Sequence, residues 1–449
     1  MKKTLAPVNG KASRPLDTSE DLDPVKKALT PGNGQPDGFR ARNSYFANRD
    51  PLQTLGSLIR RGASAVLAKG VPGFTPQAIE TVLSFARGRA SHRAMLGFRY
   101  FSFKRFLNFW LIELQLYVGA TRVRGYPYEW ETDTTNICQL KCPLCHTGLD
   151  NIRRLKGVMH FDTFRKTIDE IKDYVIWLSL YSWGEPLINK QIPKFISYAH
   201  QAKIATLISS NLSLPLTPEK VEAIVRSGLD VLIISMDGIT QEVYEKYRVK
   251  GKLSLVLENI RLFVQKKKEL GYKTPYLEWQ FIVMKQNEHQ MPEARRLARE
   301  LGVDKIVFKR VDFPHGMGNG ELTRKWVPVN TAGFRRDDLL DKPYNEKSGK
   351  CWRLWRSAVV NWDGGYAPCC YLTDAKDDFG NVKEDSVKTI WNNAHYRTAR
   401  TLFRNGNRPE VGVGCLTCEV YLESPNGRKH SAAILRGMRR AFKEVVKVD

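Results

Sequence analysis

Between residues 128 and 310 the sequence alternates six times between a short apolar run and a stretch with helical periodicity. Short apolar runs of this kind are typical of strands that are buried on both faces of a parallel sheet. The predicted strands lie near residues 128–134, 175–181, 205–210, 231–236, 276–284 and 305–310. Six consecutive strand–helix units predict an α/β fold whose parallel sheet curls into a partial, TIM-like (β/α)6 barrel. In such barrels the active site lies at the carboxyl ends of the strands.

The helical stretches carry boundary signals that support this prediction. Thr217 and Pro218 are suited to the N-cap and the first turn of a helix, and Gly228 is suited to the position just after its end. Gly302 likewise follows the apolar periodicity that ends at Leu301. Two of the six predicted helices therefore have sequence-encoded ends.

Three cysteines follow the first predicted strand, in the spacing C-x3-C-x2-C. Cys138, Cys142 and Cys145 are close enough in sequence to bind one metal centre from a single loop. A structural zinc site needs four protein ligands, and His146 is the neighbouring candidate for a fourth, although adjacent residues rarely reach one metal without strain. An iron–sulfur cube held by three thiolates instead leaves one iron open to an outside ligand. The spacing favours the cluster, and zinc stays as the alternative.

The three-cysteine spacing resembles the signature of the radical S-adenosylmethionine (SAM) superfamily. The resemblance implies a [4Fe–4S] cluster held by Cys138, Cys142 and Cys145, with SAM bound at the open iron. It also implies reductive cleavage of SAM to a 5′-deoxyadenosyl radical, which abstracts a hydrogen atom from the substrate. Leu144 stands where this superfamily often has an aromatic residue. The protein's share of the chemistry is then placement and exclusion of water.

The resemblance also implies residues that contact SAM after the second predicted strand. Trp183, Gly184 and Glu185 resemble the superfamily's Gly-Gly-Glu motif, which holds the amino group of SAM. Trp183 replaces the first glycine of that motif. Gly-Glu-Pro is by itself a common turn sequence, so the order of the motifs along the chain carries the resemblance.

Further candidates for SAM binding follow the third and fourth predicted strands. Ser209 and Asn211 stand where similar enzymes contact the ribose. Ser235 and Arg248 stand where similar enzymes contact the SAM carboxylate, and a guanidinium offers a bidentate contact with a carboxylate. No catalytic acid or base is identified, because Glu278 and Asp312 are equally well explained as structural residues.

The other five of the eight cysteines lie in the C-terminal part, at Cys351, Cys369, Cys370, Cys415 and Cys418. The segment before Cys369 reads as a β-hairpin with Asp363-Gly364 at its turn. A C-x17-C hairpin with a distant C-x2-C pair supplies four thiolates, enough for one zinc ion or one cluster.

Beside the first motif, this second group resembles a SPASM domain in its shortened "twitch" form. The resemblance implies one auxiliary [4Fe–4S] cluster held by Cys351, Cys369, Cys415 and Cys418. Cys370 is then a spare thiol that could exchange roles with Cys369. A segment from Val387 to Phe403 reads as the helix that such domains place between the hairpin and the last cysteine pair.

Composition and pattern assign the remaining segments. The first fifty residues are rich in Pro, Gly, Asn, Asp and Lys and have no apolar period. The predicted organisation is a disordered basic arm at 1–50, a helical extension at 51–125, the barrel at 126–315, a linker at 316–350, the auxiliary cluster domain at 351–425 and a basic amphipathic C-terminal helix within 426–449.

The net charge of +24 predicts an anionic partner or substrate. Two basic stretches with an apolar face, Phe98–Tyr117 and Ser431–Val448, raise the prospect of peripheral contact with the inner face of a membrane. For the first of them an ordinary helix packed on the barrel is the slightly favoured alternative. No run approaches the ~18 apolar residues of a spanning helix, and no signal peptide is evident. A cytoplasmic protein is therefore expected.

These patterns together predict a radical SAM enzyme that acts on an anionic or lipid- or sugar-linked substrate. The auxiliary cluster would relay an electron, and a flavodoxin- or ferredoxin-type protein would donate electrons. A peptide-modifying maturase of the SPASM type is the alternative, modestly disfavoured because no separate leader-peptide-binding domain is evident. An alternative of another class is a zinc-bound nucleic-acid-binding protein, which is disfavoured because interleaved aromatic residues for base stacking are lacking.

Overall fold

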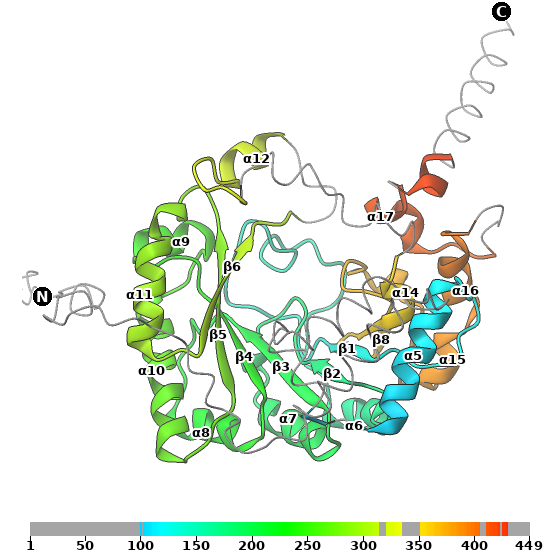
Figure 1. The fold of residues 1–449 in the computed structure, drawn as a ribbon, viewed down its shortest axis with the longest axis horizontal. Helices are drawn as coiled ribbons and strands as arrows, with labels where there is room; N and C mark the ends of the chain where they lie inside the picture. Colours follow the sequence, from blue (N-terminus) through cyan, green and yellow to red (C-terminus); the bar gives the residue numbers. More distant parts are fainter. Residues whose placement is uncertain are drawn as a thin grey trace, which may run out of the picture. The chain divides into compact units, whose positions relative to one another are not determined.

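The computed structural model of the chain describes residues 99–100, 102–313, 320–334, 351–404, 410–422 and 424–429. Its centre is one nine-stranded sheet with the order β6-β5-β4-β3-β2-β1-β7-β8-β9 (Figure 1). The strands are β1 (Glu129–Thr132), β2 (Trp177–Ser179), β3 (Ala205–Ser210), β4 (Val231–Ser235), β5 (Tyr276–Val283), β6 (Lys305–Arg310), β7 (Ser357–Val360), β8 (Gly365–Ala367) and β9 (Gly380–Asn381). Strands β1 to β6 are all parallel, so the predicted α/β class and its six-stranded parallel core are confirmed.

Helices lie between the strands along the chain and cover the outer face of β1–β6 (Figure 1). The α-helices are α5 (Phe103–Tyr117), α6 (Phe161–Ile171), α7 (Ile192–Gln201), α8 (Pro218–Arg226), α9 (Gln241–Tyr247), α10 (Leu253–Glu269), α11 (Met291–Leu301), α12 (Gly320–Trp326), α14 (Arg353–Arg356), α15 (Val387–Trp391), α16 (Ala394–Thr401) and α17 (Glu419–Leu422). Short 3-10 helices are η2 (Pro186–Ile188), η3 (Glu288–Gln290), η4 (Ala375–Asp377) and η5 (Gly414–Thr417).

The helix ends follow the sequence signals. The Thr217 hydroxyl accepts a hydrogen bond from the Lys220 amide at 3.3 Å, so it caps α8, and Pro218 occupies the first turn. Gly228 follows α8 with φ of +84°. Helix α11 ends at Gly302, which is left-handed with φ of +74°. The predicted ends of both helices are therefore confirmed.

The two faces of the parallel sheet have different roles. Phe308 of β6 lies under Arg295 of α11, with the guanidinium carbon 4.4 Å from the ring centre, so this face is covered by helices. The opposite, inner face carries a buried apolar cluster of Ala205, Leu207, Val231 and Ile233, onto which Tyr100, Trp177, Tyr181 and Tyr276 pack. The inner face is therefore closed by side chains toward the amino ends of the strands, and space for a ligand remains at their carboxyl ends.

The C-terminal region is joined to the barrel by strand pairing. Strand β7 pairs in parallel with β1, and β8 and β9 continue the sheet in antiparallel fashion. The hairpin turn at Gly364 has φ of +90°, which suits glycine. The prediction of a hairpin at Asp363-Gly364 is thus confirmed, whereas its addition to the edge of the barrel sheet was not foreseen.

The prediction of one helix at 387–403 is wrong in one respect, because this segment forms two helices, α15 and α16. Asn392 ends α15, and Asn393 caps α16 by accepting a hydrogen bond from the Tyr396 amide at 3.1 Å. Two successive Asn residues favour a cap over a helix interior, since their side chains compete for backbone hydrogen bonds.

Helix α5 packs on the barrel with one side. Its Glu113 is fully buried, accepts a hydrogen bond from the Tyr128 hydroxyl at 2.8 Å and pairs with Arg356 at 2.5 Å. The basic arm at 1–50, most of the helical extension and linker, and the C-terminal amphipathic helix lie outside the described residues. Within the described residues, no helix has the length and apolarity needed to cross a membrane.

Candidate active site and second cysteine group

The cysteine loop leaves the carboxyl end of β1 and is held there by buried polar side chains. The Thr135 hydroxyl donates to the Gly157 carbonyl at 2.7 Å. The Asn136 amide donates to the Leu155 carbonyl at 2.9 Å and accepts from the Gly157 amide at 2.9 Å. These contacts tie the start of the loop to its return segment, so the three cysteines between them are presented at the end of the barrel.

The three loop thiols lie close enough to interact electrostatically. Cys142 is buried, whereas Cys138 and Cys145 are partly accessible. Burial, with smaller contributions from the charges of Glu185, Cys142 and Cys145, raises the pKa of Cys138 to about 12. Metal ligation requires thiolates, so assembly of a metal site here must release protons. The His146 ring, the alternative zinc ligand, instead pairs through Nδ1 with Asn151 Oδ1 at 2.9 Å.

The thiol spacing favours a cluster over a single ion. Within the described part of the chain, no three Cys, His, Asp or Glu side chains converge as the ligands of one metal ion do. The thiolates that hold an iron–sulfur cube bind different irons, so they lie farther apart than the four ligands of a zinc ion. Three thiols on one loop can each bind one iron of such a cube, which leaves the fourth iron open to an outside ligand.

The loop after β2 lies directly against the cysteine loop. A Cβ atom at Gly184 would lie 1.7 Å from the Thr135 carbonyl oxygen, so only glycine fits this approach. The Glu185 amide donates to the Ile137 carbonyl at 2.9 Å. The buried Glu185 carboxylate accepts from the Leu187 and Asn211 amides at 3.0 and 2.8 Å. Glu185 thus holds the neighbouring loops in position.

The predicted ribose contacts lie near the first cysteine. The Asn211 side chain accepts from Gln139 at 2.8 Å, and its Nδ2 lies 3.8 Å from Cys138 Sγ. Ser209 and Ser235 lie on adjacent strands, with their hydroxyl oxygens 3.1 Å apart. Asn211 therefore positions the cysteine loop, and the two serines are the hydroxyls that face each other at the strand ends.

Arg248 lies between a buried carboxylate and a loop thiol. Its Nε donates to Asp237 Oδ2 at 2.7 Å, and its Nη1 lies 3.9 Å from Cys142 Sγ. Asp237 is fully buried and also accepts from the Ile282 amide at 2.6 Å. Asp237 lies two residues after Ser235, and its role as the anchor of Arg248 could not be read from sequence spacing.

Two carboxylates, Glu131 on β1 and Asp133 directly after it, are functional candidates that no sequence motif singles out. Glu131 is in register with Ser179, and Ser179 with Leu207, so Glu131 faces the inner side of the sheet. Asp133 follows two residues later and accepts backbone hydrogen bonds from residues 182–184. Burial, followed by the charge of Glu131, raises the pKa of Asp133 to about 8. Acidic residues within a buried strand were the available signal.

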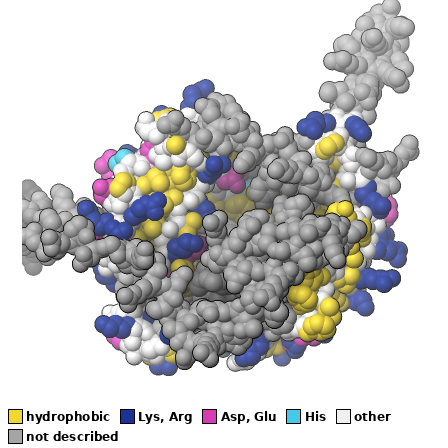
Figure 2. All heavy atoms as spheres, viewed as in Figure 1, with side chains coloured by type: hydrophobic (Ala, Val, Ile, Leu, Met, Phe, Trp, Pro, Cys, Tyr) yellow, Lys and Arg dark blue, Asp and Glu magenta, His cyan; other side chains and the backbone are white. Residues whose placement is uncertain are grey.

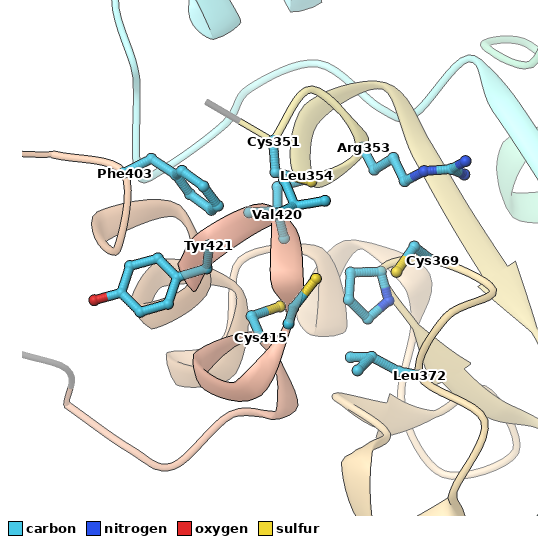
Figure 3. A pocket seen from close by; sticks show the side chains of 11 residues that line it. Cys351, Arg353, Leu354, Cys369, Leu372, Phe403, Cys415, Val420 and Tyr421 are labelled. Atoms are coloured by element: carbon cyan, nitrogen blue, oxygen red, sulfur yellow. The ribbon is translucent and has the colours of Figure 1, made fainter. Parts of the chain in front are cut away.

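The second cysteine group converges on a pocket (Figure 3). The four predicted ligands Cys351, Cys369, Cys415 and Cys418 all line it. The remaining lining is mostly apolar and includes Leu354, Leu372, Phe403, Val420 and Tyr421. Burial raises the pKa of Cys351 to about 12 and raises that of Cys369 and Cys415 as well. Four thiols around a mostly apolar pocket, two of them buried and two partly accessible, fit a cluster that needs protection from water.

Cys370 does not line this pocket. Its thiol lies near Glu131 of β1, and burial with that negative charge raises the pKa of the Cys370 thiol. Its backbone carbonyl accepts a hydrogen bond from the Trp183 indole at 2.8 Å. The two adjacent cysteines thus face different parts of the molecule, because the chain bends at Cys369 and turns at Cys370 just after β8.

A buried ion cluster joins the cysteine loop to the hairpin of the second group. Arg154 contacts Asp363 and Asp378 at 2.6 Å each, and its side chain is 2% exposed. The Trp362 indole donates to the Leu155 carbonyl at 2.9 Å. The loop that carries the first three cysteines therefore packs directly on the domain that carries the other five.

Comparison with known proteins agrees with this arrangement. Residues 132–305 match the model of the radical SAM superfamily, and residues 351–419 match that of SPASM, an iron–sulfur cluster-binding domain. The chain is 25% identical over 320 residues to the tungsten-containing aldehyde ferredoxin oxidoreductase cofactor-modifying protein of Pyrococcus furiosus, covering 64% of this chain and 86% of that protein. It is 23% identical over 315 residues to the PqqA peptide cyclase of Granulibacter bethesdensis, covering 64% and 82%.

A solved structure shares the fold. Streptococcus suis SuiB bound to S-adenosylmethionine is similar with a TM-score of 0.50 and 15% identity, over 83% of this chain and 87% of that one. At this identity the likeness is one of fold.

Proposed function

Because this chain belongs to the radical SAM superfamily and carries a SPASM domain, we propose that it is an enzyme that abstracts a hydrogen atom from its substrate. The family prediction made from the cysteine spacing is confirmed, and with it the requirement for a [4Fe–4S] cluster, SAM and auxiliary iron–sulfur chemistry. The observation that carries the proposal is the convergence of three thiols at the end of β1 and of four thiols in an adjoining domain.

The residues divide into two ligand sets with separate roles. Cys138, Cys142 and Cys145 would hold the first cluster, and Cys351, Cys369, Cys415 and Cys418 would hold one auxiliary cluster. When bound, the first cluster and SAM supply a 5′-deoxyadenosyl radical as the hydrogen-abstracting species.

The chain's own task is to position SAM and exclude water. Ser209 and Ser235 present hydroxyls at the strand ends, and Arg248, held by Asp237, presents a cation near Cys142. Gly184 allows the loop after β2 to approach the cysteine loop. The apolar cluster on the inner face closes the barrel below these groups, so a ligand is confined to the strand ends.

An anionic substrate, such as a lipid- or sugar-linked phosphate, fits the charges at the edge of the barrel. Lys305 and Lys309 of β6 are exposed and pair in register with Glu278 and Ile282 of β5, on the inner face. The overall charge of +24 favours the approach of such a substrate. A flavodoxin- or ferredoxin-type protein would supply the electron, for which a basic surface is suitable because such donors are acidic.

A peptide is the second candidate substrate. One relative is named as a peptide cyclase, and another as a cofactor-modifying protein. Strand β6 is also an edge of the sheet, so an extended peptide could pair with it by strand addition. Competition for turnover between a synthetic peptide library and nucleotide sugars would separate the two substrate classes.

Peripheral membrane contact is proposed for the outer side of α5. Phe103, Leu107, Leu114 and Tyr117 are exposed on that helix. Figure 2 shows hydrophobic side chains gathered where Figure 1 places α5, with Lys and Arg side chains beside them. An apolar stripe bordered by cations suits an anionic membrane surface.

The proposed function is tested by anaerobic purification, iron and sulfide analysis, and incubation with dithionite and SAM. Two four-iron clusters predict about eight irons per chain, and 5′-deoxyadenosine should form. Cys142→Ser should abolish 5′-deoxyadenosine, whereas Cys415→Ser should lower the iron content without abolishing it. Zinc without iron, and no 5′-deoxyadenosine, would overturn the proposal.

A further inference from the structure

Trp183 contacts the loop of the first cysteine group through two neighbouring residues. Its ring lies edge-on to His146, with the ring centres 4.6 Å apart and the planes at 88°. Its carbonyl accepts a hydrogen bond from the Thr147 hydroxyl at 2.7 Å. Both partners directly follow Cys145, so Trp183 is fixed against the loop that carries the first three cysteines.

The same side chain reaches the second cysteine group. The Trp183 indole N–H donates to the Cys370 carbonyl at 2.8 Å. That carbonyl shares its peptide unit with the Tyr371 N–H, which donates to the Cys369 thiol. A continuous path therefore runs from the indole N–H through one peptide unit to a sulfur in the four-thiol pocket.

Hydrogen bonds in such a chain strengthen each other. A donor on the carbonyl oxygen withdraws electron density from the peptide, which makes its N–H a better donor to the sulfur. Hydrogen bonds to cluster sulfurs stabilise the reduced, more negative state of a cluster and so raise its reduction potential.

We propose that Trp183 is a positioning residue that raises the reduction potential of the auxiliary cluster, acting through the Cys370–Tyr371 peptide on the Cys369 ligand. This inference rests on the proposed function, because it requires a cluster in the four-thiol pocket. It gives a role to the residue that replaces a glycine of the superfamily's motif. It also explains why the Cys370 backbone matters although its thiol lies outside the pocket.

The test is a potentiometric titration of the anaerobically purified full chain, followed by EPR. The step measured is one-electron reduction of the auxiliary cluster by dithionite, in which no bond to the protein forms or breaks. Trp183→Phe keeps a ring beside His146 but removes the N–H. It should disfavour reduction about threefold, which lowers the midpoint potential by about 28 mV because a tenfold change is about 59 mV.

Two further variants separate the hydrogen bond from general damage. Trp362 lies in the hairpin between β7 and β8, and its indole N–H donates to the Leu155 carbonyl at 2.9 Å. Trp362→Phe removes that N–H. It should leave the potential unchanged. Trp183→Leu removes the ring as well as the N–H, and should shift the potential by the same amount as Trp183→Phe.

The outcomes distinguish this inference from the proposed function on which it rests. An auxiliary cluster with the same potential in the wild type and in Trp183→Phe overturns the inference and leaves the proposed function intact. A shift in Trp183→Leu alone, or an equal shift in Trp362→Phe, also overturns it. A wild-type protein with only the first cluster overturns the inference together with the proposed four-thiol ligand set.

Discussion

Replacing Arg154 by Met should destabilise the protein strongly and in a pH-dependent way. The guanidinium is 2% exposed and contacts both Asp363, which is 29% exposed, and Asp378, which is 13% exposed. Removing one partner of a buried ion pair typically costs about 3–5 kcal/mol, because the remaining charge stays buried and uncompensated. Here two carboxylates remain and repel each other. We therefore expect a loss of about 4 kcal/mol in the free energy of unfolding at pH 8.

The pH dependence follows from Asp378. Burial raises its pKa to about 6 even with Arg154 present, which opposes that rise. The unfolded value is about 3.9, so the folded state binds the extra proton, and stability falls as pH rises through this window. Without Arg154 the folded pKa rises further, and the loss continues to higher pH. The deficit of Arg154→Met should therefore be smaller at pH 5 than at pH 8.

Urea unfolding followed by tryptophan fluorescence at both pH values measures this difference. Arg165→Met is the matched control, because Arg165 pairs with Asp162 on the surface, where both side chains are more than half exposed. Such pairs contribute about 0–1 kcal/mol. A second variant, Arg154→Met with Asp378→Asn, should recover part of the loss at pH 8. A deficit below about 1 kcal/mol, or one that is equal at both pH values, would refute the reasoning.

Three further predictions concern the candidate active site. Gly184→Ala would place a methyl group 1.7 Å from the Thr135 carbonyl oxygen, so the two loops must move apart. The rate of 5′-deoxyadenosine formation should fall about 100-fold, since a displacement of about 1 Å at an active site can cost that much, and an unchanged rate would contradict the close approach. The free energy of unfolding of Asp133→Asn should rise relative to that of the wild type as pH increases from 5 to 8, by up to about 1.4 kcal/mol per pH unit, because the raised pKa of Asp133 makes its ionisation costly in the folded state. A stability difference that does not change with pH would count against this. Arg248→Lys keeps a positive charge beside Asp237 but loses the planar guanidinium, so the Kd for SAM should rise about tenfold in anaerobic calorimetry at constant iron content. An unchanged Kd would remove Arg248 from the SAM site.

Strands β3 and β4 could be predicted because they are mostly buried apolar runs with clear ends. The strand at Ala205–Ser210 was predicted with its observed bounds, and the cap at Thr217 was also correct. The pairing of β1 with β7 could not be predicted, because no local pattern links strands more than two hundred residues apart.

The candidate site was predictable in position but less so in detail. The spacing of the cysteines indicated both thiol groups, whereas the choice between Cys369 and Cys370 required the backbone direction of the segment. The resemblance predicts Asn211 and Glu185 as SAM contacts, and this stays a prediction; the structure adds hydrogen bonds by which they hold loops around Cys138. Such roles depend on which atoms of a side chain are already paired, and spacing along the chain does not contain that information.

The most direct test of the two-site account is EPR of the dithionite-reduced protein with and without SAM. We predict two cluster signals in the wild type, of which SAM alters only one, because only the cluster held by three thiolates has an iron open to an outside ligand. Cys142→Ser should lose the SAM-sensitive signal and retain the other. A single signal that SAM does not alter, or a colourless zinc protein, would contradict the account.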